Sequence, residues 1–368
     1  MTAGDRPRGA RRRALAGGAG RAVSSLAVVR PAPGPRWPIG LQAAISVAVP
    51  VAVGGLTGHD QAGLLAASGA FTCLYVGGRR SVERVKVLPF IALALTLCAA
   101  AGTAAGPSPW IAGAGLVVIT MLAAAAAYGF SLGPPGPLFA VLVYGLSAHV
   151  SGLADGHRLV PAGTVVGAVA AGCAFSCVVA ASALILPSHR RGPVPTVREM
   201  LPGPRWDTEA RELLARTAVV AIVGTAVSMA VVDPTRAYWT VSAGVAVIGA
   251  RPGRGAAASR GLHRIVGTLV GAGLYLALAS WVELPTLALA LVLAALQFAV
   301  ELVVVRHYAL ALAFITPLVL FITGAATGSP PSIEVVGERV LDTVVGGTLG
   351  ALTGLLHRPP RRAEPPQP

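Results

Sequence analysis

The feature that most constrains this chain is a series of apolar blocks, 18 or more residues long, that contain no charged side chain. Such a block is about the length that a helix needs to cross a hydrocarbon core roughly 30 Å thick. Only 12% of the 368 residues are charged, whereas a soluble domain carries about 25%. This number of charged residues is too small to cover a water-exposed surface. An aqueous globular fold is therefore excluded, and the lipid bilayer is the expected partner of the chain.

The net charge of +14 does not indicate a nucleic-acid partner. Nucleic-acid binding needs basic side chains clustered on a soluble face, with stacking aromatic residues among them. Here the basic residues lie at the ends of apolar blocks, and all of them except Lys86 are arginine. The four cysteines lie inside apolar blocks, where a thiol behaves as a small hydrophobe. Neither a disulfide nor a metal site is expected from them.

Blocks bounded by proline, glycine or charge predict twelve helical spans in two sets of six. The spans lie near 39–58, 61–78, 88–108, 110–130, 136–154 and 159–186, and near 212–232, 237–250, 265–282, 284–304, 307–327 and 335–357. The predicted parts of the chain are a disordered basic cytosolic tail (1–36), a first membrane repeat (37–186), a cytosolic linker (187–211), a second membrane repeat (212–357) and a cytosolic tail (358–368). The expected fold class is all-α, a polytopic membrane protein built as two parallel six-helix repeats.

The distribution of basic residues predicts the orientation of the chain. If the N-terminus is cytosolic, 26 of the 29 Lys and Arg residues fall on the inner side, and only Arg158, Arg236 and Arg339 fall outside. Cytoplasmic loops of membrane proteins carry such an excess of basic residues, whereas acidic residues contribute little. We therefore expect a multi-pass protein of the plasma membrane with both termini in the cytoplasm.

Two similarities between the halves indicate a duplication. The second span of each half runs into a basic inner loop, at 79–87 and 251–264, and both sixth spans contain Thr-Val-Val-Gly, at 164–167 and 343–346. An even number of spans per repeat gives both halves the same orientation, which defines a parallel repeat about an axis along the membrane normal. A substrate path is then expected at the interface between the halves.

The stretch 237–277 is the most informative part of the sequence. It contains, in order, Tyr238-Trp239, a Gly/Pro/Arg loop and Arg260-x-x-x-Arg264-x-x-Gly267-Thr268-x-x-Gly271, and is followed by Tyr308, Thr316-Pro317 and Arg339-x-x-Asp342-Thr343-x-x-Gly346. This order resembles the FUSC family of membrane proteins, typified by fusaric acid resistance and aromatic acid exporter proteins, over roughly residues 212–357. The first half lacks the Tyr-Trp pair and the Arg-x-x-Gly-Thr run. The resemblance implies export of small, often aromatic, organic acids.

The span 237–250 is shorter than a membrane crossing requires. It has 14 residues between Arg236 and Arg251, whereas a crossing helix needs roughly 20. Short or interrupted spans point to binding sites in transporters, because free helix ends can meet a polar ligand in a protein-lined cavity. Tyr238 and Trp239 then either line a ligand site or belong to the aromatic belt at the outer interface. From the sequence we favour the belt.

Arg260 and Arg264 lie four residues apart, on one helical face at the inner end of a span. The interpretation that we favour from the sequence is an anchor in contact with lipid phosphate. The alternative is a cationic vestibule that concentrates carboxylate substrates before they enter the path.

Small-residue ladders occur in the third and sixth spans of the second half. Glycines spaced in this way let helix backbones approach closely. The ladders consist of Gly267 and Gly271 in the third span, and of Gly346, Gly350 and Gly354 in the sixth. Their parallel placement predicts that these two helices touch.

Arg339 and Asp342 form an oppositely charged i,i+3 pair inside the last span. Ionisable groups at membrane depth are costly, so they face a cavity or each other and mark substrate paths. The alternative is a pair one turn from the outer end that simply reaches water. As a hypothesis, the substrate path includes Tyr238, Trp239, Arg260, Arg264, Arg339 and Asp342.

These features together predict a transporter and not an enzyme. No constellation of nucleophile, base and metal ligands is recognisable, and no phosphate-cradling loop is present, so no cofactor is expected. The expected function is export of small aromatic acids, coupled to protons through Asp342. A passive organic-anion channel, a non-transporting accessory membrane protein and a lipid-acting enzyme are the alternatives. Substrate identity and homo-oligomer formation stay open.

The charge distribution generates a prediction about topology. A reporter that is active only in the cytoplasm should be active when fused at residue 195 and at either terminus, because the basic loops are retained on that side. A reporter that requires the opposite side should be inactive at the same positions. Activity of the second reporter at residue 195 would contradict the predicted orientation.

Overall fold

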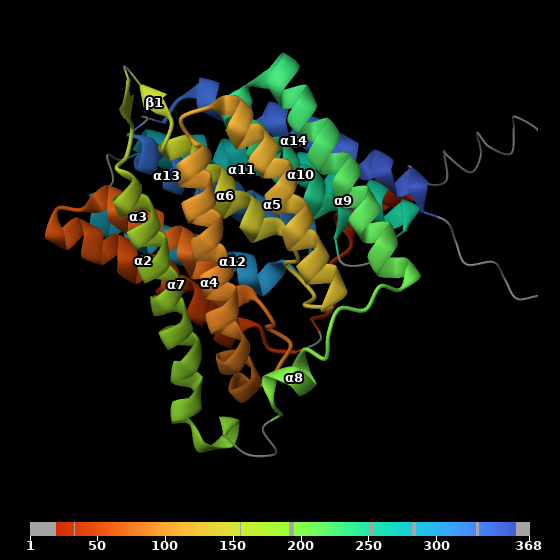
Figure 1. The fold of residues 1–368 in the computed structure, drawn as a ribbon, viewed down its shortest axis with the longest axis horizontal. Helices are drawn as coiled ribbons and strands as arrows, with labels where there is room; N and C mark the ends of the chain where they lie inside the picture. The colour runs from red at the N-terminus through yellow and green to blue at the C-terminus, as the bar shows by residue number, and fades with distance from the viewer. Residues whose placement is uncertain are drawn as a thin grey trace, which may run out of the picture.

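The computed structural model describes residues 20–32, 34–154, 156–190, 195–249, 253–281, 285–328 and 331–357. Most of this chain is helical (Figure 1), which confirms the all-α fold. The first half contains α2 (Trp37–Thr57), α3 (Asp60–Gly69), α4 (Ser81–Ala105), α5 (Pro109–Gly129), α6 (Leu138–Val150) and α7 (Ala162–Ser182). The second half contains α9 (Thr208–Val227), α10 (Ala237–Ile248), α11 (Arg254–Trp281), α12 (Thr286–Val303), α13 (Tyr308–Thr327) and α14 (Ile333–Thr353). The strands β1 (Leu153–Ala154) and β2 (His157–Arg158) form a small antiparallel hairpin.

Every predicted span coincides with one of these helices, but the helices are unequal in length. Eight of the described helices are long and apolar enough to cross a membrane, which confirms a polytopic membrane protein. The second helix of each half is much shorter, since α3 has 10 residues and α10 has 12. At 1.5 Å per residue, α10 is about 18 Å long and cannot cross the hydrocarbon core alone. The fifth helices are also short, with 13 residues in α6 and an apolar stretch of only 308–324 in α13.

Helices at corresponding places make corresponding contacts in the two halves. In the first half, α4 packs against α6 and α7, while α3 packs against α2 and α7. In the second half, α11 packs against α13 and α14, while α10 packs against α9 and α14. Between the halves, α2 contacts α12 as α9 contacts α5, and α6 contacts α10 as α13 contacts α3. Exchanging the halves thus preserves the contact pattern, as it does in a two-fold parallel repeat. The exact domain boundaries stay predictions.

The short helices place α3, α6, α10 and α13 where the halves meet. The contacts between α6 and α10 and between α3 and α13 all involve second and fifth helices. In Figure 1, α6 and α10 lie in the middle of the bundle, with α2 and α3 towards one edge and α9 at the other. Shortened segments at corresponding positions of two repeats are typical of the substrate site of a transporter.

Arginine side chains cap the C-terminal ends of the two short helical segments. After α3 the chain continues as η2 (Ala70–Leu74), and Arg84 of α4 donates from Nη2 to the carbonyl oxygen of Cys73 at 2.5 Å. At the end of α10, Arg260 of α11 donates from Nη1 to the carbonyl oxygen of Ile248 at 2.7 Å. Both Cys73 and Ile248 are fully buried, so water cannot satisfy these carbonyl groups. A cation at a helix C-terminus satisfies free carbonyl oxygens and complements the helix dipole.

The glycine ladders mark close helix crossings, but not the crossing that the sequence predicts. Although α11 and α14 do touch, Gly267 and Gly271 face α13, and Gly346 and Gly350 face α10. A Cβ atom at Gly350 would lie 2.5 Å from the carbonyl oxygen of Gly244, closer than Cβ atoms come in real structures. The predicted contact between α11 and α14 is therefore confirmed, but the ladder glycines make their closest approaches to α13 and α10, because spacing identifies a helix face and not the neighbour that it meets. Gly354 is buried after the end of α14 and begins η7 (Gly354–Leu356).

The shared Thr-Val-Val-Gly does not mark equivalent positions either. A Cβ atom at Gly167 would meet nothing within 4 Å, whereas one at Gly346 would overlap the carbonyl oxygen of Thr240. The equivalence of the halves therefore lies in which helices pair, and not in these four letters.

Residues 20–36 pack against the second half, although the sequence predicts a disordered tail over 1–36. The backbone N–H of Arg30 donates to the carbonyl oxygen of Arg306 at 3.0 Å. Arg36 forms an ion pair with Glu301 of α12 at 2.7 Å, and Glu301 is only 4% exposed. A buried carboxylate such as that of Glu301 needs a cationic partner, and Arg36 supplies it. This ion pair holds the segment around Arg36 against α12. Residues 1–19 lie outside the described chain.

The predicted linker over 187–211 also contains structure. Residues 197–200 form the short helix α8 (Val197–Met200), which begins with a capping box between Thr196 and Glu199. Helix α9 begins at Thr208, four residues before the predicted span, because the side chain of Asp207 caps it by accepting from the N–H of Ala210 at 2.7 Å. Polar composition alone had suggested a linker there.

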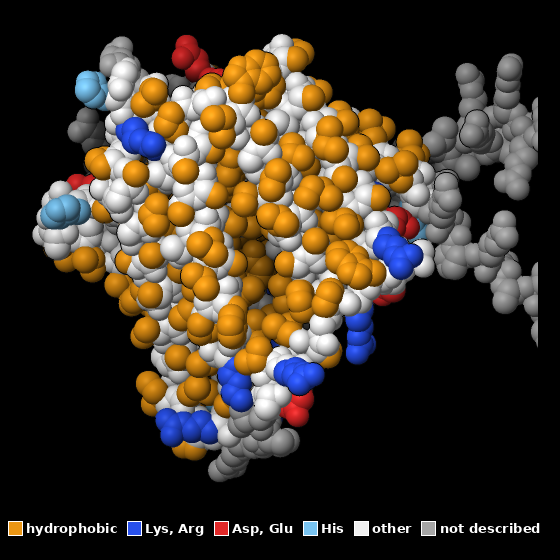
Figure 2. Space-filling view, in the orientation of Figure 1, with side chains coloured by type: hydrophobic (Ala, Val, Ile, Leu, Met, Phe, Trp, Pro, Cys, Tyr) orange, Lys and Arg blue, Asp and Glu red, His pale blue; other side chains and the backbone are white. Residues whose placement is uncertain are grey.

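The surface of the bundle matches a bilayer environment. Large apolar side chains are exposed on many helices, including Leu56 at 72%, Trp110 at 75% and Leu291 at 71%. Figure 2 shows hydrophobic side chains across most of one face, with Lys and Arg gathered along its lower and right-hand edges. Contiguous exposed apolar surface of this extent is expected of lipid-facing helices and not of a soluble monomer.

Replacing Gly350 with leucine tests the crossing of α10 and α14. A leucine side chain would overlap the backbone of Gly244, and overpacking of this kind costs about 1–3 kcal/mol or more. We expect a lower yield of monodisperse protein in detergent and a lower melting temperature. Gly337→Leu is the matched control, since it lies on the same helix and a Cβ atom there meets nothing within 4 Å. Equal behaviour of the two variants would contradict the described crossing.

Candidate functional site

Charged side chains surround the N-terminal end of α10. The turn before it is η6 (Pro234–Arg236), which Asp233 caps by accepting from the N–H of Thr235 at 2.7 Å. Arg236 is 9% exposed, and its Nε lies 3.4 Å from Asp233 Oδ2 and 4.0 Å from Asp342 Oδ2. Its Nη1 contacts Glu338. One guanidinium is thus shared by three carboxylates, two of which come from α14.

Asp342 is fully buried and is only partly satisfied. Its Oδ1 accepts a hydrogen bond from Thr240 Oγ1 at 2.8 Å, while its Oδ2 makes no hydrogen bond to a described residue. Arg339, its predicted partner, forms no ion pair with it in the described chain. The expected i,i+3 pair is therefore wrong. Asp342 instead meets Arg236 and Thr240, because α10 packs closely against this face of α14.

Arg339 is buried against an aromatic face. It is 2% exposed, and its Cζ lies 4.9 Å from the ring centroid of Trp239. Its Nε and Nη1 make no hydrogen bond to any residue that the structure describes. A desolvated cation–π contact contributes about 2 kcal/mol, whereas burying an ion costs several kcal/mol. The described residues therefore leave this charge incompletely compensated.

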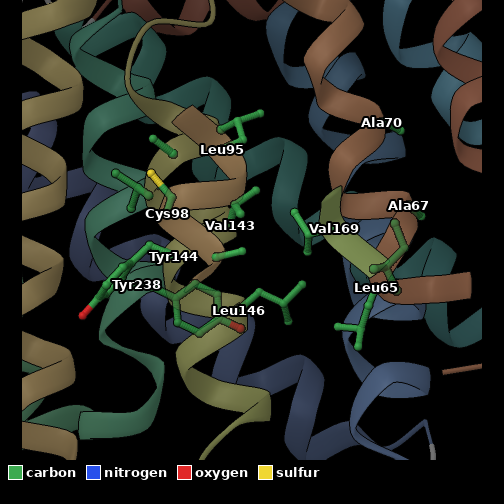
Figure 3. Close-up of a cluster of buried hydrophobic side chains, with 14 of the residues drawn as sticks. Leu65, Ala67, Ala70, Leu95, Cys98, Val143, Tyr144, Leu146, Val169 and Tyr238 are labelled. Carbon is green, nitrogen blue, oxygen red and sulfur yellow. The ribbon is translucent and has the colours of Figure 1, made fainter. Parts of the chain in front are cut away.

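Tyr238 and Trp239 do not belong to an interfacial belt, contrary to the interpretation that the sequence favours. They are 4% and 3% exposed, because Gly145 of α6 leaves room for the ring of Tyr238. Figure 3 shows Tyr238 beside Tyr144 and Leu146 of α6. The hydroxyl of Tyr238 and the Nε1 of Trp239 make no hydrogen bond within the described chain. Two further polar donors are thus held at the site without a partner.

Arg264 faces the protein and not lipid phosphate, so the favoured interpretation is wrong for Arg264, whereas for the partly buried Arg260 it stays a prediction. Arg264 is 5% exposed, and its Nη1 donates to the hydroxyl of Tyr308 at 3.0 Å. Arg260 is half-buried, caps α10 and lines a pocket of about 820 Å³. The N-terminal end of α11 is held against the bundle because Ile248 of α10 and Tyr308 of α13 offer oxygen acceptors there.

A small apolar cavity adjoins the aromatic pair where the two halves meet. It has a volume of about 30 Å³, which is about the space that one water molecule occupies. Its lining comes from α3, η2, α6, α10 and α13, and consists of Ser68, Phe71, Leu142, Val143, Leu146, Tyr238, Trp239, Val319, Ile322 and Thr323. The site thus combines buried cations with an apolar cavity that is too small for an organic acid in this state.

Some residues of the site escaped the sequence reasoning. Arg236 lies outside the predicted spans and Glu338 stands next to Arg339 in the sequence, yet the structure brings Arg236 and Glu338 into contact. Thr240 follows Trp239 directly and had no assigned role. The spacing of Arg236 and Thr240, one helical turn apart on an unusually short span, is the signal that could have found them, because it places both on one face.

Arg216 is a second buried arginine that the sequence did not single out. It is 0% exposed, its Nε donates to Thr353 Oγ1 at 3.3 Å, and its Nη1 lies 3.9 Å from Glu212. The predicted span begins near residue 212, which places Arg216 close to its start, but α9 begins eight residues before Arg216. The earlier helix start puts Arg216 inside the bundle.

The fold and this site define a polytopic helical membrane protein with a charged cluster buried beside a contact between its halves. Among the described residues, no group of three or more His, Cys, Asp or Glu side chains could hold a metal ion. The Tyr-Trp pair and the arginines of α11 and α14 all lie in the second half, at positions 238–339.

Comparison with known proteins identifies this second half. Residues 216–353 match the family described as fusaric acid resistance protein-like. An uncharacterized membrane protein of Bacillus subtilis (strain 168), YvaC, is 31% identical over 115 residues, which cover 30% of this chain and 18% of that protein. The match thus spans less than a fifth of the length of this relative. No solved structure matches the chain significantly. The match over residues 216–353 confirms the resemblance to the FUSC family for this part of the chain.

Proposed function

We propose that this protein is a transporter that exports small organic acids, aromatic ones among them, and that Arg339 receives the carboxylate. The observation that carries the proposal is the burial of Arg339 in the described chain without a direct ion pair and with no hydrogen bond at its Nε and Nη1. Intramembrane ionisable groups are costly and mark substrate paths. A carboxylate offers a guanidinium two oxygen acceptors in the geometry that it prefers, and would supply the missing compensation.

The surroundings of Arg339 favour a carboxylate attached to an apolar or aromatic body. The Trp239 ring lies under the guanidinium, and the Tyr238 hydroxyl and Trp239 Nε1 make no hydrogen bond in the described chain. The neighbouring cavity is lined almost entirely by apolar and aromatic side chains. The aromatic ring of a ligand can stack on such side chains and bury its apolar surface against them. This agrees with the aromatic acids that the FUSC resemblance implies.

The position of the cavity supports alternating access. Its walls come from both halves, through α3 and α6 on one side and α10 and α13 on the other. Rocking of two parallel repeats about their interface opens and closes such a site. Arg260 and Arg264 would attract carboxylates from the basic side, which we propose to be cytosolic, in the plasma membrane.

Proton coupling is proposed through Asp342. This carboxylate is fully buried and has one oxygen without a hydrogen bond in the described chain, close to Arg236. Protonation would release Arg236 to its other partners, Asp233 and Glu338. A change in that network can shift α14 relative to α10 and so alter access to Arg339.

Two other functions remain as outcomes to be tested. A passive organic-anion channel would use the same cations but would show no dependence on a proton gradient. An accessory membrane protein would carry no flux. The buried charges of α14 favour a substrate path over a structural role, because apolar residues at these positions would avoid the free-energy cost of burying charge.

Efflux from cells or vesicles tests the proposal. Arg339→Ala should abolish efflux of benzoate-like acids, and Arg339→Lys should weaken it, because lysine keeps the charge but loses bidentate geometry. Asp342→Asn should leave binding intact and remove the dependence of efflux on pH. Arg211→Ala is the control, since Arg211 is exposed on α9.

Expression of every variant in the membrane must first be matched. Wild-type efflux in both the Arg339→Ala and Asp342→Asn proteins would show that these residues are only structural. Full flux without a proton gradient in the wild type would establish the channel instead.

A further inference from the structure

A second, larger pocket lies at the basic end of the second half, away from the apolar cavity. It has a volume of about 820 Å³, within the range of sites that bind cofactor-sized molecules. Its basic lining comes from the N-terminal segment, α11 and the turn before α13, and consists of Arg21, Arg30, Arg260, Arg306, His263 and His307. Ser24, Ser25 and Ser259 add hydroxyl groups. No Asp or Glu is among the described residues that line it.

The N-terminal segment is fixed as one wall of this pocket. The hydroxyl of Ser25 lies 2.9 Å from Nε2 of His263, and Nε2 of His307 lies 2.8 Å from the carbonyl oxygen of Leu26. The backbone bond from Arg30 to Arg306 closes the wall. The arginine side chains of the segment are therefore held opposite those of α11 and of the turn before α13, by contacts that do not use the guanidinium groups of Arg30 and Arg306.

We infer that this pocket binds a phosphate-bearing anion that carries at least two negative charges. A single carboxylate neutralises one guanidinium, whereas Arg30, Arg260 and Arg306 all line this pocket. Arginine forks match phosphate oxygens bidentately, and charge-assisted hydrogen bonds of this kind are the strongest that side chains make. The hydroxyl of Ser259 can donate a further hydrogen bond. The pocket is also large enough for more than one phosphate group.

Such a ligand would act on the N-terminal segment. It would bridge Arg30 of the segment to Arg306 and so hold the segment over the end of α11, where Arg260 caps α10. The same chemistry can come from a soluble phosphate compound or from the headgroup of an anionic lipid, because the pocket lies at the end of membrane helices. The inference concerns binding only, and it holds or fails independently of the transport proposal.

Calorimetric titration of the full chain with pyrophosphate tests the inference. The protein is placed in nanodiscs of phosphatidylcholine, and the double variant Arg30→Gln/Arg306→Gln is compared with wild type. Both side chains are exposed, and the backbone hydrogen bond from Arg30 to Arg306 does not depend on them, so the fold should be kept. We expect saturable binding in the wild type and at least about tenfold weaker binding in the double variant. Arg198→Gln/Arg211→Gln removes the same charge from exposed positions outside the pocket and should change the affinity less than about twofold.

A second set of nanodiscs, containing phosphatidic acid, distinguishes the source of the phosphate. Weaker pyrophosphate binding to the wild type in these discs would show that a lipid headgroup occupies the pocket, and unchanged binding would assign it to a soluble anion. Equal weakening in the two double variants would show only a general attraction to basic surface and would overturn the inference. The inference would also be overturned if the wild type and the Arg30→Gln/Arg306→Gln protein bound pyrophosphate equally well and responded equally to phosphatidic acid.

Discussion

Backbone groups at membrane depth must be satisfied by the protein itself, and this structure depends on how it meets that requirement at α3 and α10. Both helices are too short to cross the bilayer, so their C-terminal carbonyl groups are exposed to the interior of the bundle. Arg84 and Arg260, each from the helix that follows, donate to those carbonyl groups. Without these caps the short helices would carry unsatisfied polar groups, each costing several kcal/mol. With them, the second helix of each half can end near the contact between halves.

The short helices in turn create the chemistry of the site. Because α10 is short, its N-terminal end and the charged turn before it lie against α14, where Arg236 can meet Glu338 and Asp342. Glycines at 346 and 350 bring α14 close enough for Thr240 to reach Asp342. Arg339 packs instead against Trp239 and forms no direct ion pair in the described chain. The first half supplies apolar walls to the cavity through Phe71 and α6 but no equivalent charges. The two halves thus share a scaffold while one of them holds the charged cluster.

Hydropathy and charge located the twelve main helices, although not their exact ends or the short helix α8, because these signals depend on local composition. Partners could not be predicted in the same way, since Arg339 and Asp342 share a helix face in the sequence yet contact different neighbours once α10 packs against α14. Burial of Tyr238 depends on Gly145, 93 positions earlier in the chain, which no local pattern reveals. One useful signal was overlooked: Gly102-Thr103-x-x-Gly106 repeats the pattern of 267–271, and in both halves these glycines lie where the third helix crosses the fifth.

The account stands on the claim that the buried guanidinium of Arg339 takes a carboxylate beside Trp239. The chain has five tryptophans, so phenylalanine at positions 37, 110, 206 and 281 leaves Trp239 as the only fluorophore of its kind. Titration of this protein with benzoate should change the tryptophan emission saturably, and benzamide, which has the same ring without the charge, should not. The benzoate response should disappear in the Arg339→Ala protein. An equal response to benzamide, or a benzoate response that survives the loss of Arg339, would contradict the claim.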